Sequence, residues 1–204
     1  MQPKAAPLSP AEYLDREEKS PVKCEYVNGE IYAMSGAKRR HNLIAANLLY
    51  RARGAATGSH SGCQVFGSDM KIHVKTHNSF YYPDLSVCCD PSDRDDLYLS
   101  RPCFIVEVLS PSTALIDRRE KRASYTTLES LREYVIVDQD RMLVEIYRRE
   151  SSGWRGYLLN QPGDAVESSC LDLHISLQQI YEGVELPPPG VAESELPEYA
   201  AVER

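Results

Sequence analysis

The chain has 204 residues, of which 42% are hydrophobic and 26% are charged, with a formal net charge of −7. These proportions exclude a disordered chain and indicate one domain, large enough to bury a hydrophobic core unaided. No apolar run approaches the roughly 18 residues that span a bilayer. The first residues also lack the apolar segment of a secretory signal, so we expect a cytoplasmic protein.

The negative charge is concentrated at the C-terminal end. Residues 182–204 contain six glutamates and one arginine, a net charge of −5, together with four prolines. This composition favours a disordered acidic tail at residues 183–204, which leaves a single domain at residues 1–182. The domain is nearly neutral, so the acidic balance of the whole chain neither excludes nor supports a nucleic-acid partner.

The chain contains six cysteines, and none of them forms a Cys-x-x-Cys pair or lies at zinc-ligand spacing from a histidine. Three lie inside apolar runs, where a free cysteine behaves as a small buried hydrophobic residue. We therefore expect reduced, structural thiols, as in a reducing cytosol. The six are Cys24, Cys63, Cys88, Cys89, Cys103 and Cys170.

The N-terminal part begins with a predicted helix and hairpin. Residues 9–19 are predicted to be helical because Ser9 can cap the helix and Glu12 can complete a capping box. An Asn-Gly pair at residues 28–29 then joins two short apolar runs. This pair predicts a tight β-hairpin, because both of its residues tolerate positive φ.

The next segment, residues 37–53, has helical spacing and is expected to bury one stripe. The stripe comprises Leu43, Ala46, Leu49 and Tyr50. Residues 69–75 then alternate as a half-buried strand, and we assign Asp69 and Lys71 on its polar face to solvent.

The remaining elements alternate between strands and helices. Residues 82–89 and 103–109 are short apolar runs, typical of central strands buried on both faces. We predict helices at 117–131 and 176–183, and strands at 133–138, 142–149 and 154–159. This order predicts one α/β (α+β) domain around a mixed sheet.

Two acids interrupt the buried strands: Asp84 opens the first run, and Glu107 lies in the middle of the second. Burying a carboxylate is costly unless something compensates its charge. Two carboxylates that converge at one end of a sheet suit a hard divalent cation such as Mg²⁺, which can activate water and polarise a phosphoryl oxygen. The structural alternative is that Glu107 bonds an arginine or faces solvent, while Asp84 caps a turn.

Lys121 lies on the predicted helix that follows the Glu107 strand. Asp117 precedes it at i, i+4 spacing, and Tyr125 follows on the same face. One interpretation is a surface ion pair that stabilises the helix by about 0.3 kcal/mol. The other is that Lys121 reaches over the strand end to stabilise an anionic transition state or to orient water. Spacing alone does not decide between them.

Two segments resemble the Uma-type family of restriction endonucleases, in the PD-(D/E)XK nuclease superfamily: YYPDLSVCCD and PCFIVEVLSPSTALIDRREKRASYTTLESLREYVIVD. The resemblance continues upstream through CEYVNGEIYAMSGAKRRHNLIAANL and covers residues 8–182. It implies a restriction endonuclease-like core, in which helices flank a mixed β-sheet, preceded here by the N-terminal helix and β-hairpin.

The resemblance also implies the site. Asp84 matches the family's metal-binding aspartate and Glu107 the acid of its E-x-K motif, with the backbone carbonyl of Val108 as a further metal ligand. Leu109 occupies the usual lysine position, which departs from the superfamily pattern. We expect Lys121 to replace that lysine, because a long ammonium side chain can reach the same point from the following helix.

Three further residues are candidate members of the site. His41 matches a family histidine, and it either approaches the acids or a phosphate or satisfies a loop carbonyl. Glu25, on the first hairpin strand, is either another site acid or part of a cross-strand salt bridge. Tyr125 shares the helix face of Lys121.

Two basic clusters are candidate DNA contacts, since phosphate contacts supply most non-specific affinity for DNA. The first is Lys38, Arg39 and Arg40, and the second includes Arg118 and Arg122. The alternative is that both are solvated helix faces. The chain lacks a Gly-rich phosphate loop, a G-x-S-x-G elbow and a zinc finger.

Together these features predict a Mg²⁺-dependent endonuclease that hydrolyses DNA phosphodiester bonds, with Mn²⁺ as the experimental surrogate for Mg²⁺. The catalytic set is Asp84, Glu107, Lys121 and His41. A homodimer is expected, because cleavage of both strands commonly uses two sites. The alternatives are a non-catalytic nucleic-acid or protein interaction module on this core, and a metal-dependent hydrolase with another substrate.

Overall fold

The computed structural model describes residues 7–34, 36–58, 62–110 and 114–188. Its centre is a six-stranded sheet with the strand order β11-β10-β9-β8-β6-β3. The strands are β3 (Gln64–Gly67), β6 (Leu85–Cys88), β8 (Phe104–Leu109), β9 (Glu133–Asp138), β10 (Val144–Glu150) and β11 (Gly153–Leu159). Within this sheet β8 and β9 are parallel and the other pairs antiparallel, so the predicted mixed sheet is confirmed.

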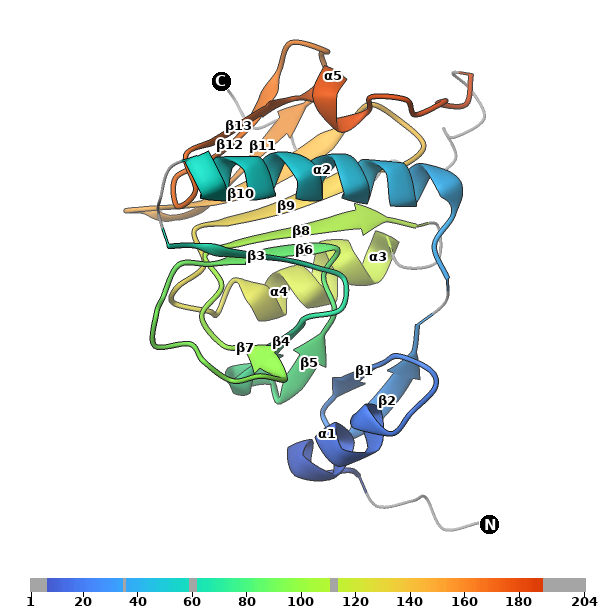
Figure 1. The fold of residues 1–204 in the computed structure, drawn as a ribbon, viewed down its shortest axis with the longest axis vertical. Coiled ribbons are helices and arrows are strands. Elements are labelled where there is room, and N and C mark those ends of the chain that lie inside the picture. The colour runs from blue at the N-terminus through green and yellow to red at the C-terminus, as the bar shows by residue number, and fades with distance from the viewer. Residues whose placement is uncertain (1–6, 35, 59–61, 111–113, 189–204) are drawn as a thin grey trace.

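Helices cover both faces of the six-stranded sheet (Figure 1). Helix α2 (Arg39–Gly58) crosses one face, with the hairpin β12 (Ala165–Ser168) and β13 (Leu173–Ser176) and helix α5 (Leu177–Ile180) beside it. On the other face lie α3 (Ala114–Ile116), a π-helical turn η2 (Asp117–Lys121) and α4 (Arg122–Tyr125). This second group is the crossover that the parallel β8–β9 pair requires.

Strand β8 alternates between two hydrophobic cores. Phe104, Val106 and Val108 pack in the core beneath α2. Ile105 and Leu109 belong to the core on the α4 side. Because side chains alternate along a strand, Glu107 falls on the α4 side, toward η2.

A second, five-stranded sheet has the order β2-β1-β5-β4-β7. Its strands are β1 (Cys24–Val27), β2 (Glu30–Ala33), β4 (Lys71–Val74), β5 (Ser79–Tyr81) and β7 (Tyr98–Leu99), with a 3₁₀ turn η1 (Lys75–His77) between β4 and β5. Helix α1 (Pro10–Glu18) packs on it through a small aromatic core of Tyr13, Tyr26 and Phe80. Glu25 lies on β1 of this sheet.

The local predictions at the N-terminus are confirmed. Ser9 caps α1, and Glu12 completes the capping box with it. The β1–β2 hairpin turns through Asn28 and Gly29, with φ of 50° and 93°. These features depend only on residues within one turn of each other, which is why the sequence reveals them.

Two helix predictions are corrected. The buried residues of α2 are Ile44, Leu48 and Ala52, whereas Tyr50 of the expected stripe is 74% exposed. Ile44, Leu48 and Ala52 are spaced four residues apart and lie on one face of α2. This face is buried because α2 packs against the central sheet and also against β13 and α5. The helix predicted at 117–131 begins at residue 114 and ends at Tyr125, and residues 126–132 form turns and a short link to β9.

The expectation of six reduced thiols is wrong for four of them. The structure joins Cys63 to Cys89 and Cys103 to Cys170 as disulfides, and it leaves Cys24 and Cys88 free. The partners lie 26 and 67 residues apart in sequence. Pairing of β3 with β6 brings Cys63 to Cys89, and packing of the β12–β13 hairpin on the main core brings Cys170 to Cys103, so local spacing does not reveal either pair.

The start of the expected acidic tail packs on α2. Val184 and Leu186 contact the main core, and the side-chain amide of Asn47 donates to the carbonyl oxygens of Ile180 and Glu182. Residues 189–204 lie outside the described residues. Among the described residues, no helix combines the length and apolar character needed to cross a bilayer.

Candidate active site

The two strand acids meet at one end of the central sheet. Strands β6 and β8 are antiparallel with Leu85 opposite Val106, so the next pair outward is Asp84 and Glu107. The backbone N–H of Val108 donates to Asp84 Oδ2 at 2.7 Å, which fixes that carboxylate against the end of β8. Pairing of β6 with β8 therefore brings the two acids to the same end of the sheet.

Lys121 lies buried among three carboxylates. Its Nζ is 2.8 Å from Glu25 Oε1, 3.2 Å from Glu107 Oε1 and 3.3 Å from Asp117 Oδ1, and its side chain is 5% exposed. Asp117 and Lys121 are the first and last residues of the π-helical turn, a type of irregularity that is frequent at functional sites. The surface-pair interpretation of Lys121 does not hold, because both partners are buried.

The two additional candidates also belong to this cluster. The hydroxyl of Tyr125 donates to Glu107 Oε1 at 3.1 Å. Glu25 Oε1 accepts from the backbone N–H of Tyr82 at 3.1 Å, beside its contact with Lys121. Strand β1 thus adds a fourth acid, from a different sheet.

His41 contacts the cluster from α2. Its Nε2 lies 3.3 Å from Asp84 Oδ2. Burial by itself lowers the pKa of His41, but the Asp84 carboxylate and the Val108 carbonyl outweigh it and raise the pKa above its usual value. Nδ1 is buried without a hydrogen-bond partner among the described residues. Of the two alternatives for His41, this contact favours the approach to the acids.

The charges of the cluster do not balance. Among the described residues, four acids, Glu25, Asp84, Glu107 and Asp117, face one lysine, Lys121, and one histidine, His41. Burial raises the pKa of Glu107 well above its usual value, Lys121 opposes this shift, and the neighbouring acids reinforce it. Burial by itself lowers the pKa of Lys121, but its acidic neighbours outweigh burial and raise it.

The oxygen donors at this point fit a hard divalent cation. Asp84 Oδ2 lies 3.3 Å from His41 Nε2 and accepts from the Val108 N–H. A divalent cation takes carboxylate and carbonyl oxygens, and it would compensate the excess negative charge of the cluster. Asp84, Glu107 and the Val108 carbonyl are the residues that would hold it.

The predicted basic contacts separate into two groups. The side chain of Arg118 is 12% exposed, and its Nε lies 2.7 Å from Glu145 Oε1. Arg118 is therefore part of a buried ion pair rather than of an exposed basic surface. The guanidinium of Arg122 lies 4.6 Å from the ring centre of Tyr147. By contrast, Lys38 and Arg39 are exposed. With Arg40, Leu43, Gly183 and Glu185 they line a shallow pocket beside the start of α2.

Sequence reasoning missed two members of the site. Asp117 lies in the cluster as well as pairing with Lys121, and the signal for it in the sequence is the i, i+4 spacing of the two residues. The N–H of Val108 holds Asp84, and no sequence pattern indicates a backbone donor of this kind. Asp69, assigned to solvent, has a side chain that is 93% exposed, as expected.

Comparison with known proteins gives consistent matches over most of the chain. Residues 10–178 match the Uma2 family model, described as "Putative restriction endonuclease". Two Synechocystis sp. proteins, slr1290 and sll1609, are each 35% identical, over 87% and 76% of this chain and 93% and 86% of their own lengths. The crystal structure of a putative nuclease belonging to DUF820 from Anabaena variabilis has a TM-score of 0.70 at 16% identity, covering 86% of this chain and 98% of that one. The fold is therefore that of this nuclease-like structure, and the chain belongs to the Uma2 family of restriction endonuclease-like proteins.

Proposed function

We propose that the chain is a Mg²⁺-dependent endonuclease that hydrolyses phosphodiester bonds in DNA. The observation that carries the proposal is the contact between Lys121 and Glu107, with Asp84 opposite Glu107 on the neighbouring strand. It joins two carboxylates and one ammonium group at a single sheet end. When bound by Asp84, Glu107 and the Val108 carbonyl, Mg²⁺ would polarise the phosphate and acidify an attacking water.

The protein's own side chains have separable roles in this proposal. Lys121 stays protonated at neutral pH because its acidic neighbours raise its pKa, so it provides a fixed positive charge for the phosphorane rather than a base. His41 holds Asp84 in place through its Nε2. A two-fold dimer remains part of the proposal, because it would supply a second site for the second strand.

Metal binding is the first test, because it requires no knowledge of the substrate. Titrating Mn²⁺ into the full chain by calorimetry is expected to show binding in the wild type and in Asp69→Asn, a matched control whose side chain is exposed. Asp84→Asn is expected to lose this binding, together with Mg²⁺-dependent nicking of a supercoiled plasmid. Retained cleavage in Asp84→Asn would contradict the proposal, and DNA binding indifferent to Mg²⁺ and to Asp84 would favour the interaction module instead.

DNA contacts are expected near the start of α2. Replacing both Lys38 and Arg39 with alanine should weaken binding equally for all sequences and should reduce the slope of log K against log salt by roughly 2, at about 0.9 per phosphate contact. The measurement is fluorescence anisotropy of a labelled duplex at several salt concentrations. Arg53→Ala, at the other end of the same helix, should leave the slope unchanged. An unchanged slope in the double variant would contradict this placement of DNA.

A further inference from the structure

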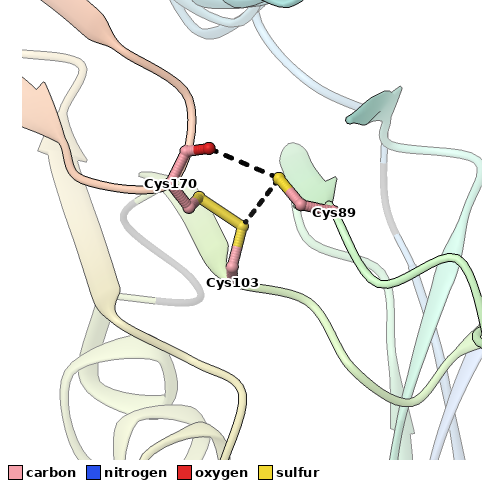
Figure 2. A group of neighbouring side chains, drawn as sticks. All are labelled: Cys89, Cys103 and Cys170. Atoms are coloured by element: carbon pink, nitrogen blue, oxygen red, sulfur yellow. Dashed lines mark hydrogen bonds between the residues drawn. A yellow bond between two sulfur atoms is a disulfide. The ribbon is translucent and has the colours of Figure 1, made fainter. Parts of the chain in front are cut away.

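Four of the six cysteines gather at one point, although they come from four separate parts of the chain. Cys63 precedes β3, Cys89 follows β6, Cys103 precedes β8, and Cys170 lies in the turn between β12 and β13. Figure 2 shows three of them around a common centre. The Sγ atoms of Cys89 and Cys103 are 3.5 Å apart, so the two disulfides touch each other.

The cluster is remote from the acids. Asp84 and Cys89 are five residue steps apart along an extended segment, which is about 16 Å at 3.3 Å per step. Cys103 likewise precedes β8, whereas Glu107 lies toward its other end. The proposed cleavage chemistry therefore makes no use of these sulfurs, and the two sites can be tested independently.

The geometry suits a soft metal ion. The ligand atoms of Cys89, Cys103 and Cys170 all lie within 4.8 Å of one another. Cys63 is bonded to Cys89, and its Sγ lies 3.6 Å from the Cys170 carbonyl oxygen, at the edge of the same cluster. Tetrahedral zinc with Zn–S bonds of about 2.3 Å needs sulfurs roughly 3.8 Å apart, close to the Cys89–Cys103 separation. Four sulfur ligands without oxygen are typical of zinc or iron–sulfur sites.

We propose that the reduced form of this cluster binds one Zn²⁺ ion through Cys63, Cys89, Cys103 and Cys170, and that the two disulfides are its oxidised form. Opening each S–S bond takes two electrons and two protons from an external reductant: two thiols supply both and become a disulfide, whereas a phosphine supplies the electrons and becomes a phosphine oxide, with water as the source of the protons and the oxygen. The four thiols then lose their protons to solvent as thiolates bind the ion. Bound zinc would link β3, β6 and β8 to the β12–β13 hairpin.

Metal content of the reduced full chain tests the proposal. Protein purified with a phosphine reductant and excess Zn²⁺, then freed of unbound metal, is expected to contain one zinc per chain by mass spectrometry. With Co²⁺ as the probe, it should show the visible absorption and sulfur-to-metal charge-transfer bands of a tetrahedral thiolate site. Both signals are expected to disappear in Cys63→Ser and in Cys170→Ser.

Three variants are controls. Cys24→Ser and Cys88→Ser remove the free cysteines and should keep the zinc. Asp84→Asn should also keep it, which separates this ion from any metal at the acids. Treating the loaded wild type with oxidised glutathione should release the zinc and lower the protein mass by four hydrogens. Failure of the reduced wild type to bind either Zn²⁺ or Co²⁺, or retention of zinc in Cys170→Ser, would overturn the proposal.

Discussion

Replacing Glu107 with glutamine is expected to reduce Mg²⁺-dependent DNA cleavage by on the order of 10³-fold, while the protein remains folded. A bound metal supplies several kcal/mol of transition-state stabilisation, roughly 4 kcal/mol, and each 1.36 kcal/mol corresponds to about tenfold in rate. Glutamine has the same shape, but it lacks the negative charge that binds the ion. The side chain is 5% exposed, and burial raises its pKa, so loss of this charge removes a desolvation cost from the folded state.

The measurement pairs plasmid nicking at saturating Mg²⁺ with thermal unfolding of the same preparations. We expect Glu107→Gln to unfold at the wild-type temperature or above it, because the charge it removes is buried. Glu167→Gln on β12 is the matched control, since Glu167 has a side chain that is 61% exposed and should affect neither property. Wild-type cleavage by Glu107→Gln would show that this carboxylate does not hold the metal.

Replacing Lys121 with methionine is expected to destabilise the fold by about 3–5 kcal/mol at neutral pH, the cost of removing one partner from a buried ion pair. Glu25, Glu107 and Asp117 would then face each other without their shared ammonium group. Methionine keeps the length and apolar stem of the lysine, so the loss measures charge rather than volume. The exposed pair of Lys19 with Asp15 provides the contrast, because Lys19→Met should cost at most about 1 kcal/mol.

The destabilisation of Lys121→Met should decrease as the pH falls. Burial raises the folded-state pKa of Glu107, so its ionised form opposes folding and its protonated form does not. Without Lys121, ionised Glu107 lowers the free energy of unfolding. This loss is complete above the raised folded-state pKa of Glu107, and it shrinks as the pH falls from there toward the unfolded-state pKa. Urea unfolding at pH 5 and pH 8 is the measurement. An equal difference from wild type at both values would show that Lys121 contributes packing rather than charge.

The residues of the acid cluster are held in place by different kinds of contact. Asp84 and Glu107 are held by strand pairing and by the Val108 amide, which is a rigid arrangement. Lys121 and Asp117 are held by the irregular π-helical turn, and Glu25 reaches them from another sheet. A substitution that weakens the pairing of β1 is therefore expected to displace Lys121 more than Asp84.

Much of the candidate site could be predicted from the sequence because its signals are local. An acid inside an apolar run is conspicuous, and so is a lysine four residues after an aspartate. These patterns identified Asp84, Glu107 and Lys121, and the family resemblance gave them roles. The capping box of α1 and the Asn-Gly turn were predictable for the same reason, since each involves residues within a few positions of each other.

Only the tertiary structure determined which distant residues meet. Glu25 reaches Lys121 across 96 positions of sequence, Cys103 reaches Cys170 across 67, and Arg118 turns inward because Glu145 lies beside it. The buried face of α2 likewise depended on the sheet and hairpin that pack against it, which moved it from Tyr50 to Ile44 and Leu48. The sequence by itself determined the elements and the chemical groups they carry, because hydrophobic periodicity and turn chemistry act over a few residues. Strand register and helix packing decided which groups converge, because they depend on contacts between residues that no local pattern connects.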